Sequence, residues 1–416
     1  MKIRPADWFG RALLVHNNRN CGYHREAFRY GNSLPVEGEE IATSAFGLLA
    51  MTKTDKFKCY RALLPEIRLM VKKLTSKDVR RWFRFYGGRA AAAVSLLVLC
   101  RVLSSCAGSG GAGRGSAVKD FKAEAEEAIT GLDPAMGDWQ GGWKLSDESD
   151  SGPLAAQVIG LGKGEYKANF LEVFDTRMEP IGILVGRLEG GAVGLAGRAY
   201  HSGIDFEVQA KIEGGKLTGT FAGQDVKGTF ALERVFRVSE TMGAKPPKGA
   251  VVLFNGKNFK EWRRADAKEG EDDAVRWELV DGAMRIKGGS IVTKKTFTDA
   301  AVHIEFRSPF MAEARGQGRG NSGVYLQGGY EIQVLDSYGL KGESNECGGI
   351  YGVGAPRVNM CAPPGQWQTY DITFAAPRYD SAGKKASDAI MTVLHNGVLI
   401  HDQVKIGAET AGGVGG

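Results

Sequence analysis

The sequence predicts an all-β protein: a C-terminal double-sheet sandwich, preceded by a small antiparallel β-domain and an N-terminal export segment. The chain has 416 residues, which is too long for one ordinary domain. It contains 59 glycines, many of them between short alternating apolar runs, as in tight β-turns. From residue 139 onward the apolar residues recur with the period of strands, and sustained helical spacing is confined to a short segment before that.

Basic charge is concentrated at the N-terminus. Residues 1–105 contain 19 Lys and Arg against 8 Asp and Glu, whereas the remainder contains 35 against 40. The net charge of +6 therefore arises from the N-terminal region. Because the globular part carries an acidic excess, its composition gives no argument for nucleic-acid binding, and we expect no nucleic-acid partner.

Residues 70–106 have the layout of a secretory signal. Basic residues precede the apolar run 90–99, which is too short to span a bilayer as a helix, and small residues follow it. Residues 103–106, Leu-Ser-Ser-Cys, also resemble a bacterial lipobox, in which Cys106 becomes lipidated. We expect export to the bacterial cell envelope or periplasm with a lipid anchor in the membrane; the alternative is a plain cleaved signal.

Residues 1–69 show no sustained periodicity of 3.6 or 2. A conventional signal would begin at Met70, so we interpret this segment as an extension from a misassigned start. The alternative is a small cytoplasmic domain followed by an internal anchor.

Residues 107–138 are predicted to be a linker with one short helix, and residues 139–242 a small antiparallel β-domain. Phe121, Ala125 and Ile129 recur at helical spacing before Gly131 and Pro134. Alternating runs then meet at glycine-containing turns near residues 162–164, 189–191, 213–215 and 223. Such hairpins indicate a small barrel or sandwich without clustered chemistry.

Residues 243–250 form a Pro/Gly linker, and the longer strands that follow it indicate a sandwich or jelly roll over residues 250–416. Cys347 and Cys361 are the only cysteines of the body, and an exported domain favours a disulfide between them. No CxxC motif or Cys/His cluster is present, so we expect no structural zinc site.

Five motifs of this region occur in a characteristic order: LFNGKNFKEW, WELVDGAMRI, GNSGVYLQGGYEIQVLDSYG, ECGGIYG and PPGQWQTYDITFAAPR. The series resembles the 3-keto-disaccharide hydrolase family, formerly the domain of unknown function 1080, over about residues 250–406. The resemblance implies a concanavalin-like jelly roll that acts on 3-keto-glucosides or related sugars. Relatives continue with a QDHG-like motif and a last strand, whereas this chain ends in GAETAGGVGG. We therefore expect a truncated sandwich with an unpaired edge.

Three strands of this region alternate apolar and polar residues, so each has one polar face. If the strands are neighbours, the polar residues share one surface that suits the donors and acceptors of sugar hydroxyls. The alternative is a solvated outer face with a surface ion pair between Glu305 and Arg307. The residues of the predicted surface are His303, Glu305, Arg307, Tyr325, Gln327, Glu331 and Gln333.

A ketone at C3 of a sugar acidifies the proton at C2, so a base can remove this proton and the C1 substituent can leave. Glu331, Glu305 and His303 are the candidate catalytic bases, and Arg307 could stabilise the oxyanion. Direct glycoside hydrolysis would instead need two carboxylates, for which Glu305 and Glu331 are also candidates.

Asp336 lies at a strand end, where it could be an acid or a ligand for a divalent metal such as calcium; the sequence assigns no cofactor. Further substrate contacts are expected from Asn321 and from Tyr351 and Asn359 in the loop between the two cysteines.

Two functions remain open at this point. One is an exported enzyme that cleaves 3-keto-glycosides, and the other is a non-catalytic, lectin-like carbohydrate-binding module. Both imply a carbohydrate partner, and neither fixes the oligomeric state. Fold alone does not decide between them.

Overall fold

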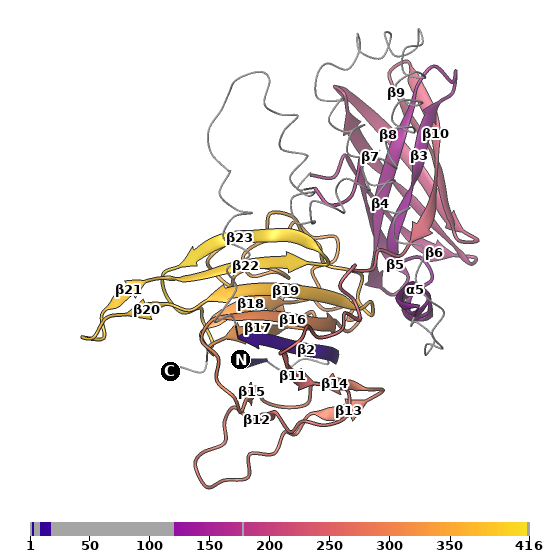
Figure 1. Cartoon of the computed structure of the whole chain (residues 1–416). Coiled ribbons are helices and arrows are strands. Elements are labelled where there is room, and N and C mark those ends of the chain that lie inside the picture. Colours follow the sequence, from indigo (N-terminus) through magenta and orange to yellow (C-terminus); the bar gives the residue numbers. More distant parts are fainter. Residues whose placement is uncertain (1, 4–8, 18–119, 177–178, 414–416) are drawn as a thin grey trace, which may run out of the picture. The chain divides into compact units, whose positions relative to one another are not determined.

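The computed structural model describes residues 2–3, 9–17, 120–176 and 179–413, and its regular structure there is almost entirely β (Figure 1). The described residues belong to one compact unit. The predicted signal segment 70–106, including Cys106, lies outside the described residues. Within the described ranges, no helix has the length and apolar character needed to cross a membrane.

Helix α5 (Phe121–Leu132) is the predicted short helix. The Asp120 carboxylate accepts hydrogen bonds from the backbone N–H groups of Lys122 and Ala123, each at 3.1 Å, and caps the N-terminus. Ala125 and Ile129 are buried at the predicted helical spacing. Local sequence signals therefore suffice to explain this element.

Residues 137–235 form a closed antiparallel barrel in which each strand pairs with the next and the last pairs with the first. The predicted glycine-containing turns all connect neighbouring strands. Because the sheet closes on itself, it has no edge strands. Of the two architectures that the sequence predicted, a barrel and a sandwich, the structure therefore shows the barrel. The strands are β3 (Gly137–Leu145), β4 (Ser151–Gly162), β5 (Glu165–Leu171), β6 (Gly182–Glu189), β7 (Ala192–His201), β8 (Ile204–Glu213), β9 (Lys216–Gly223) and β10 (Val226–Val235).

Glycines make room for aromatic rings inside this barrel. A side chain on Gly219 would collide with the ring of Phe230, and one on Gly228 with the ring of Phe221. Phe230 in turn packs against Phe170, with ring centroids 5.3 Å apart. Large aromatic rings in the interior therefore face glycines, which leave the space that the rings occupy.

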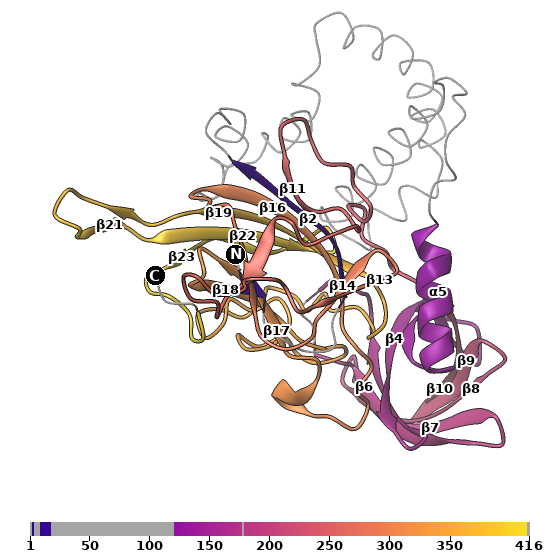
Figure 2. The same ribbon diagram turned by 90° about the horizontal axis from the view of Figure 1, so that it is seen from below.

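The C-terminal region contains two antiparallel sheets (Figures 1 and 2). The smaller sheet has the order β12 (Trp262–Arg264), β15 (Ile291–Thr293), β1 (Lys2–Ile3), β17 (Ser322–Leu326), β18 (Tyr330–Val334). The larger sheet has the order β13 (Glu278–Val280), β14 (Ala283–Arg285), β2 (Phe9–Asn17), β16 (Ala300–Arg307), β19 (Gln368–Ala375), β22 (Ala389–His395), β23 (Val398–Ile406), and β11 (Val251–Phe254) also pairs with β2. A separate hairpin comprises β20 (Arg378–Tyr379) and β21 (Lys385–Ser387).

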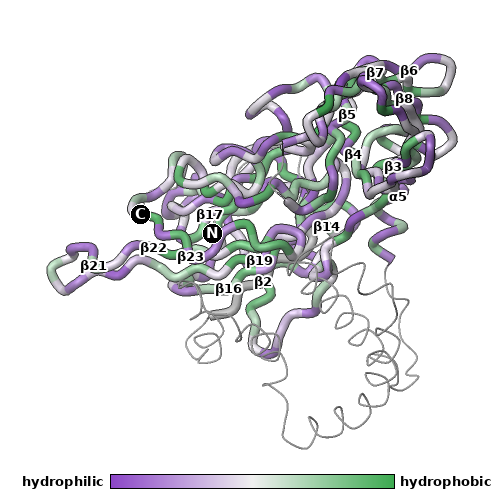
Figure 3. Tube along the Cα trace, turned by 90° about the horizontal axis from the view of Figure 1, so that it is seen from above, coloured by the Kyte–Doolittle hydropathy of each residue, from purple (hydrophilic) through white to green (hydrophobic). Residues whose placement is uncertain are grey.

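One hydrophobic core is shared by these two sheets. Ile304 and Phe306 of β16 belong to the same buried cluster as Val324 of β17 and Ile332 of β18. Apolar residues alternate with polar ones along these strands. Figure 3 shows hydrophobic and hydrophilic stretches side by side in this region. Two sheets that bury their inner faces together form a sandwich, as the long alternating strands predicted.

The first residues of the chain contribute to both sheets, which the sequence did not predict. The backbone of β1 pairs with β15 and β17, and β2 pairs with β16, β14 and β11. Both strands are interior to their sheets. The larger sheet ends at β23 on one side and β13 on the other, and the smaller sheet ends at β12 and β18.

A buried polar contact joins the barrel to the sandwich. Tyr338 is fully buried and donates a hydrogen bond of 2.7 Å to Oδ1 of Asp138 on β3. Arg237 Nε lies 2.8 Å from Asp138 Oδ2. Burial raises the pKa of Tyr338, and the Asp138 carboxylate adds to the shift. The phenol therefore remains a neutral donor at this joint.

The pairing of β1 and β2 makes a prediction about truncation. A chain that lacks residues 1–17 should unfold at a lower temperature, because the strands on both sides would lose ladder hydrogen bonds. Thermal unfolding followed by circular dichroism would measure this. An unchanged transition in the truncated chain would show that the sandwich is complete without these strands.

Candidate functional site

The predicted common polar face of three strands is wrong. β16 belongs to the larger sheet, and β17 and β18 belong to the smaller one (Figure 2). Because the inward residues of all three strands share one core, their outward residues lie on opposite sides of the sandwich. His303 and Glu305 are therefore separated from Tyr325, Glu331 and Gln333.

An amide cluster lies on the outward face of the β17–β18 hairpin; we use this name for Gln317, Asn321 and Gln333. Gln333 Nε2 donates to Gln317 Oε1 at 2.9 Å and to the Asn345 carbonyl at 3.2 Å. Asn321 Nδ2 donates to the same Gln317 oxygen at 3.1 Å. Gln333 Oε1 is buried and has no hydrogen-bond partner among the described residues. A buried acceptor of this kind is costly unless a ligand or water supplies a donor.

Glu331 lies beside this cluster and directly across the strand pair from Tyr325. Its side chain packs on Gly323, where a Cβ atom would overlap the carboxylate oxygen Oε1. Glycine at position 323 thus creates the space in which the Glu331 carboxylate lies. Glu331 and Tyr325 are both fully buried in the structure.

The C-terminal segment 407–413 covers this part of the hairpin. The backbone N–H of Glu331 donates to Thr410 Oγ1 at 3.0 Å, and Tyr325 Oη donates to the Ala411 carbonyl at 3.1 Å. The N–H of Thr410 also bonds the Gly329 carbonyl at 2.8 Å. These hydrogen bonds cover the outward face of the hairpin at Tyr325 and Glu331.

Asp336 is paired with a residue that the sequence analysis missed. Its Oδ2 lies 2.8 Å from Arg319 Nη2, and its Oδ1 accepts a hydrogen bond from the N–H of Tyr338. Burial raises the pKa of Asp336, although Arg319 and the N–H group oppose this. Among the residues with described positions, no group of three or more His, Cys, Asp or Glu is arranged to hold a metal ion. Asp336 therefore serves an ion pair within the fold.

The remaining predicted contacts lie away from the amide cluster or act through their backbone. Gln327 occupies the hairpin turn with a φ of 50° and is exposed, so it is not a strand residue. The N–H of Tyr351 donates to the Glu331 carbonyl at 3.2 Å. The Asn359 side chain accepts from the Cys361 N–H at 2.9 Å and donates to the carbonyls of Ser337 and Leu340. Arg307, at the end of β16 in the larger sheet, lies over the ring of Trp367, 5.1 Å from the ring centroid.

A buried acid–histidine cluster occupies the outward face of the larger sheet; it consists of His303, Glu305 and Asp371. His303 Nδ1 lies 2.6 Å from Asp371 Oδ1, and His303 Nε2 lies 3.5 Å from Glu305 Oε1. Asp371 was missed, although the alternation of QTYDITF puts it on the same face as Thr369. The two carboxylates also hold the segment after the barrel, through Thr241 Oγ1 at 2.7 Å from Asp371 and the Gly243 N–H at 2.6 Å from Glu305.

This cluster is suited to a structural role. Burial lowers the pKa of His303, but the hydrogen bonds to Asp371 and Glu305 outweigh it and raise the pKa to about 9. The imidazole is therefore protonated at neutral pH and cannot accept a proton there. The structure does not support His303 and Glu305 as catalytic bases beside Glu331.

Cys347 and Cys361 are both buried free thiols, so the disulfide predicted between them is not formed in this structure. Cys347 Sγ lies 3.2 Å from Tyr370 Oη, and Cys361 Sγ lies 3.6 Å from the Leu335 carbonyl. Burial raises the pKa of Cys361, and the neighbouring Cys347 adds to the shift. Each sulfur thus has a polar partner in the core.

Comparison with known proteins identifies the family of the sandwich domain. Residues 249–414 match the family described as the 3-keto-alpha-glucoside-1,2-lyase-like domain. A solved structure from Parabacteroides distasonis ATCC 8503, described as a "putative glycosyl hydrolase", is 35% identical; the similarity covers 40% of this chain and 70% of that chain, with a TM-score of 0.37. The chain belongs to the 3-keto-alpha-glucoside-1,2-lyase-like family. No curated protein matches it. The lyase-like domain contains strands β11 to β23, and with them Glu331 and the amide cluster.

The acid–histidine cluster predicts a pH-dependent stability. Because the pKa of His303 is raised in the fold, the protonated ring contributes its full stabilisation below pH 6.5 and loses it as the pH rises through about 9. We expect the unfolding temperature to fall over this interval in the native protein and to fall less in His303→Gln. Parallel curves for the two proteins would contradict the assignment.

The contact of Gly323 with Glu331 predicts a local clash. Gly323→Ala should destabilise the fold by about 1–3 kcal/mol, because the added methyl group displaces a buried carboxylate. Denaturant unfolding measures this, and Gly194→Ala, at a strand position with open space around it, is the control. In the Gly323→Ala, Glu331→Ala double variant the two costs should not add; simple additivity would refute the clash.

Proposed function

We propose that the lyase-like domain is a concanavalin-like jelly roll that cleaves 3-keto-glucosides and related glycosides, with Glu331 as the base. The observation that carries the proposal is the buried, unpartnered Oε1 of Gln333, two residues along β18 from Glu331 on the same face. A sugar hydroxyl would supply the missing donor. The family match adds the substrate class, since 3-keto-glucoside lyase-like domains are named for it.

The proposed reaction is an elimination. The Glu331 carboxylate removes the proton from C2, and the electron pair moves toward the C3 ketone to give an enolate. The enolate then re-forms the ketone and expels the C1 substituent, which takes a proton as it leaves, so that a double bond joins C1 and C2. Addition of water across this bond completes a net hydrolysis. The Gln333 acceptor oxygen near the base would hold a sugar hydroxyl in place for the proton transfer.

The placement of Glu305 favours elimination over direct hydrolysis. Direct hydrolysis needs two carboxylates on the two sides of one glycosidic bond, about 5–10 Å apart. Glu305, the predicted partner of Glu331, belongs to the other sheet and bonds the Gly243 N–H. A single base suffices for the elimination, and the ketone supplies the acidity.

One observation favours the second candidate, a carbohydrate-binding module without catalysis. Glu331 and Tyr325 are fully buried under the segment 407–413, so a substrate reaches them only if this segment moves aside. A module could instead bind sugar at the rim of the amide cluster, where Asn321 is half-buried. Release of sugar from a 3-keto-glucoside distinguishes the enzyme from the module.

We also propose that the protein is exported to the bacterial envelope and anchored through a lipid on Cys106. The support is the series of basic, apolar and lipobox-like residues within 70–106. An extracytoplasmic enzyme would meet oxidised disaccharides before their uptake.

The proposal predicts the effect of Glu331→Gln. This change preserves shape but removes the ionisable group, so turnover of a 3-keto-glucoside should fall at least about a hundredfold. Sugar release per folded molecule, measured by chromatography, is the readout.

Glu305→Gln is the matched control on the other sheet. It should lower the unfolding temperature while turnover per folded molecule stays close to that of the native protein. Loss of turnover in Glu305→Gln with retention in Glu331→Gln would move the base to the acid–histidine cluster. Sugar binding without release by the native protein would favour the module.

A further inference from the structure

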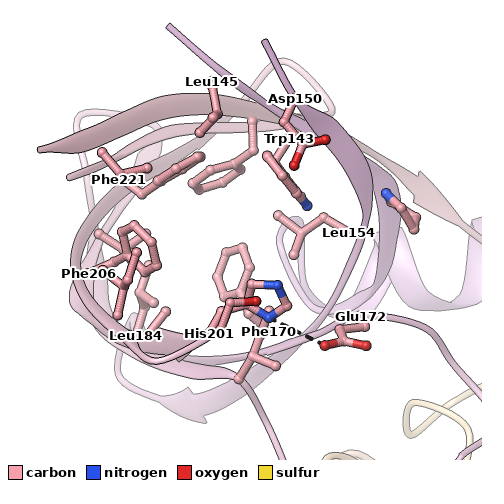
Figure 4. A pocket seen from close by; sticks show the side chains of 18 residues that line it. Trp143, Leu145, Asp150, Leu154, Phe170, Glu172, Leu184, His201, Phe206 and Phe221 are labelled. Carbon is pink, nitrogen blue, oxygen red and sulfur yellow. Dashed lines mark ion pairs between the residues drawn. The ribbon is translucent and has the colours of Figure 1, made fainter. Parts of the chain in front are cut away.

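The barrel β3–β10 contains a cavity that the proposed chemistry does not use. Its volume is about 270 Å³, and it is lined mainly by aromatic and aliphatic side chains (Figure 4). Five aromatic residues lie around it: Trp143, Phe170, Phe206, Phe221 and Phe230. We propose that the barrel binds one small apolar molecule, aromatic or branched aliphatic, whose polar end is neutral or cationic.

The cavity occupies only one part of the barrel interior. Elsewhere the same interior is filled by residues such as Trp139, Ile212, Leu217 and Leu232, which are buried and do not line the cavity. Protein interiors are normally packed to crystal-like density, with few voids larger than a water molecule. A barrel built only for stability would be filled along its whole length, so the unfilled part indicates a ligand site.

The size of the cavity sets the size of the ligand. An apolar cavity of about 150 Å³ stays dry and binds benzene. The cavity here is larger, so it accommodates a molecule of two fused rings or a short branched chain. Most of its lining is apolar, so binding would arise mainly from burial of apolar surface.

The residues at the mouth of the cavity determine which charge the polar end of the ligand can carry. It is formed by residues at the turns that follow β3, β5 and β7, and Figure 4 shows His201 next to Glu172 there. His201 Nδ1 lies 3.3 Å from Glu172 Oε1, and both side chains are about half exposed. Asp150 contributes a second carboxylate to the lining. Because the imidazole is already paired with Glu172, the mouth disfavours an anionic group.

Two fluorescent probes with the same ring system test the proposal. 1-N-phenylnaphthylamine is neutral, and 1-anilinonaphthalene-8-sulfonate carries an added sulfonate. We expect the neutral probe to bind the full chain at one saturable site, and at least about tenfold more tightly than the anionic probe. Equal affinity for both probes, or binding to several sites, would overturn the assignment.

Variants of β7 locate the binding site. Ala199 lines the cavity, so Ala199→Phe should lower the affinity for the neutral probe by at least about tenfold. Ala196→Phe adds the same ring to the exposed face of the same strand and should leave affinity unchanged. If Ala199→Phe lowers the unfolding temperature, Val226→Phe at the mouth replaces it. An equal effect of the inward and outward variants would place the probe outside the barrel.

Because no sandwich residue lines the cavity, the Glu331→Gln variant should bind the probe with unchanged affinity, whether or not it retains turnover.

Discussion

The pairing of β16 with β2 and β19, and not with β17, determines where the polar side chains of the sandwich lie. Each strand must direct alternate residues into the shared core, so the sheet to which it belongs decides the side on which the others emerge. Glu331 and the amide cluster emerge on one side, and His303 with its two carboxylates on the other. The sandwich thereby carries two polar clusters on opposite sides.

The two clusters satisfy their polar groups differently. In the acid–histidine cluster, both carboxylates contact the imidazole and the segment 239–243, so the buried charges are neutralised within the protein. In the amide cluster, the donors of Gln333 are used while its oxygen has no partner within the described part of the chain. His303 Nε2 has no hydrogen bond of normal length to a described residue, but it lies 3.5 Å from the Glu305 carboxylate and is paired by charge. Among the described residues the Gln333 oxygen has neither kind of partner, which suits a ligand that brings its own hydroxyl groups. This difference supports the binding role proposed for the amides.

Much of the local structure could be predicted from the sequence. The helix with Ala125 and Ile129 and the glycine turns of the barrel follow from short-range spacing. Glu331 and Gln333 were also correctly placed on one outward face, because a period of two is a property of a single strand. The neighbours of a strand depend on long-range pairing that periodicity does not encode, so the sequence could not separate His303 from Glu331. For the same reason it gave no sign that residues 9–17 pair with β16.

The pairing of glycines with phenylalanine rings in the barrel has a consequence for divergence. Gly219 leaves room for Phe230, and Gly228 leaves room for Phe221, while both rings also line the cavity. A side chain at Gly219 would also collide with the backbone carbonyl of Gln209, and one at Gly228 with that of Lys144. A smaller facing ring would therefore not make room for it, and both glycines must be kept while the backbone is unchanged. Relatives of this protein could still vary the shape of the interior through the rings themselves, because a smaller ring beside a retained glycine enlarges the cavity.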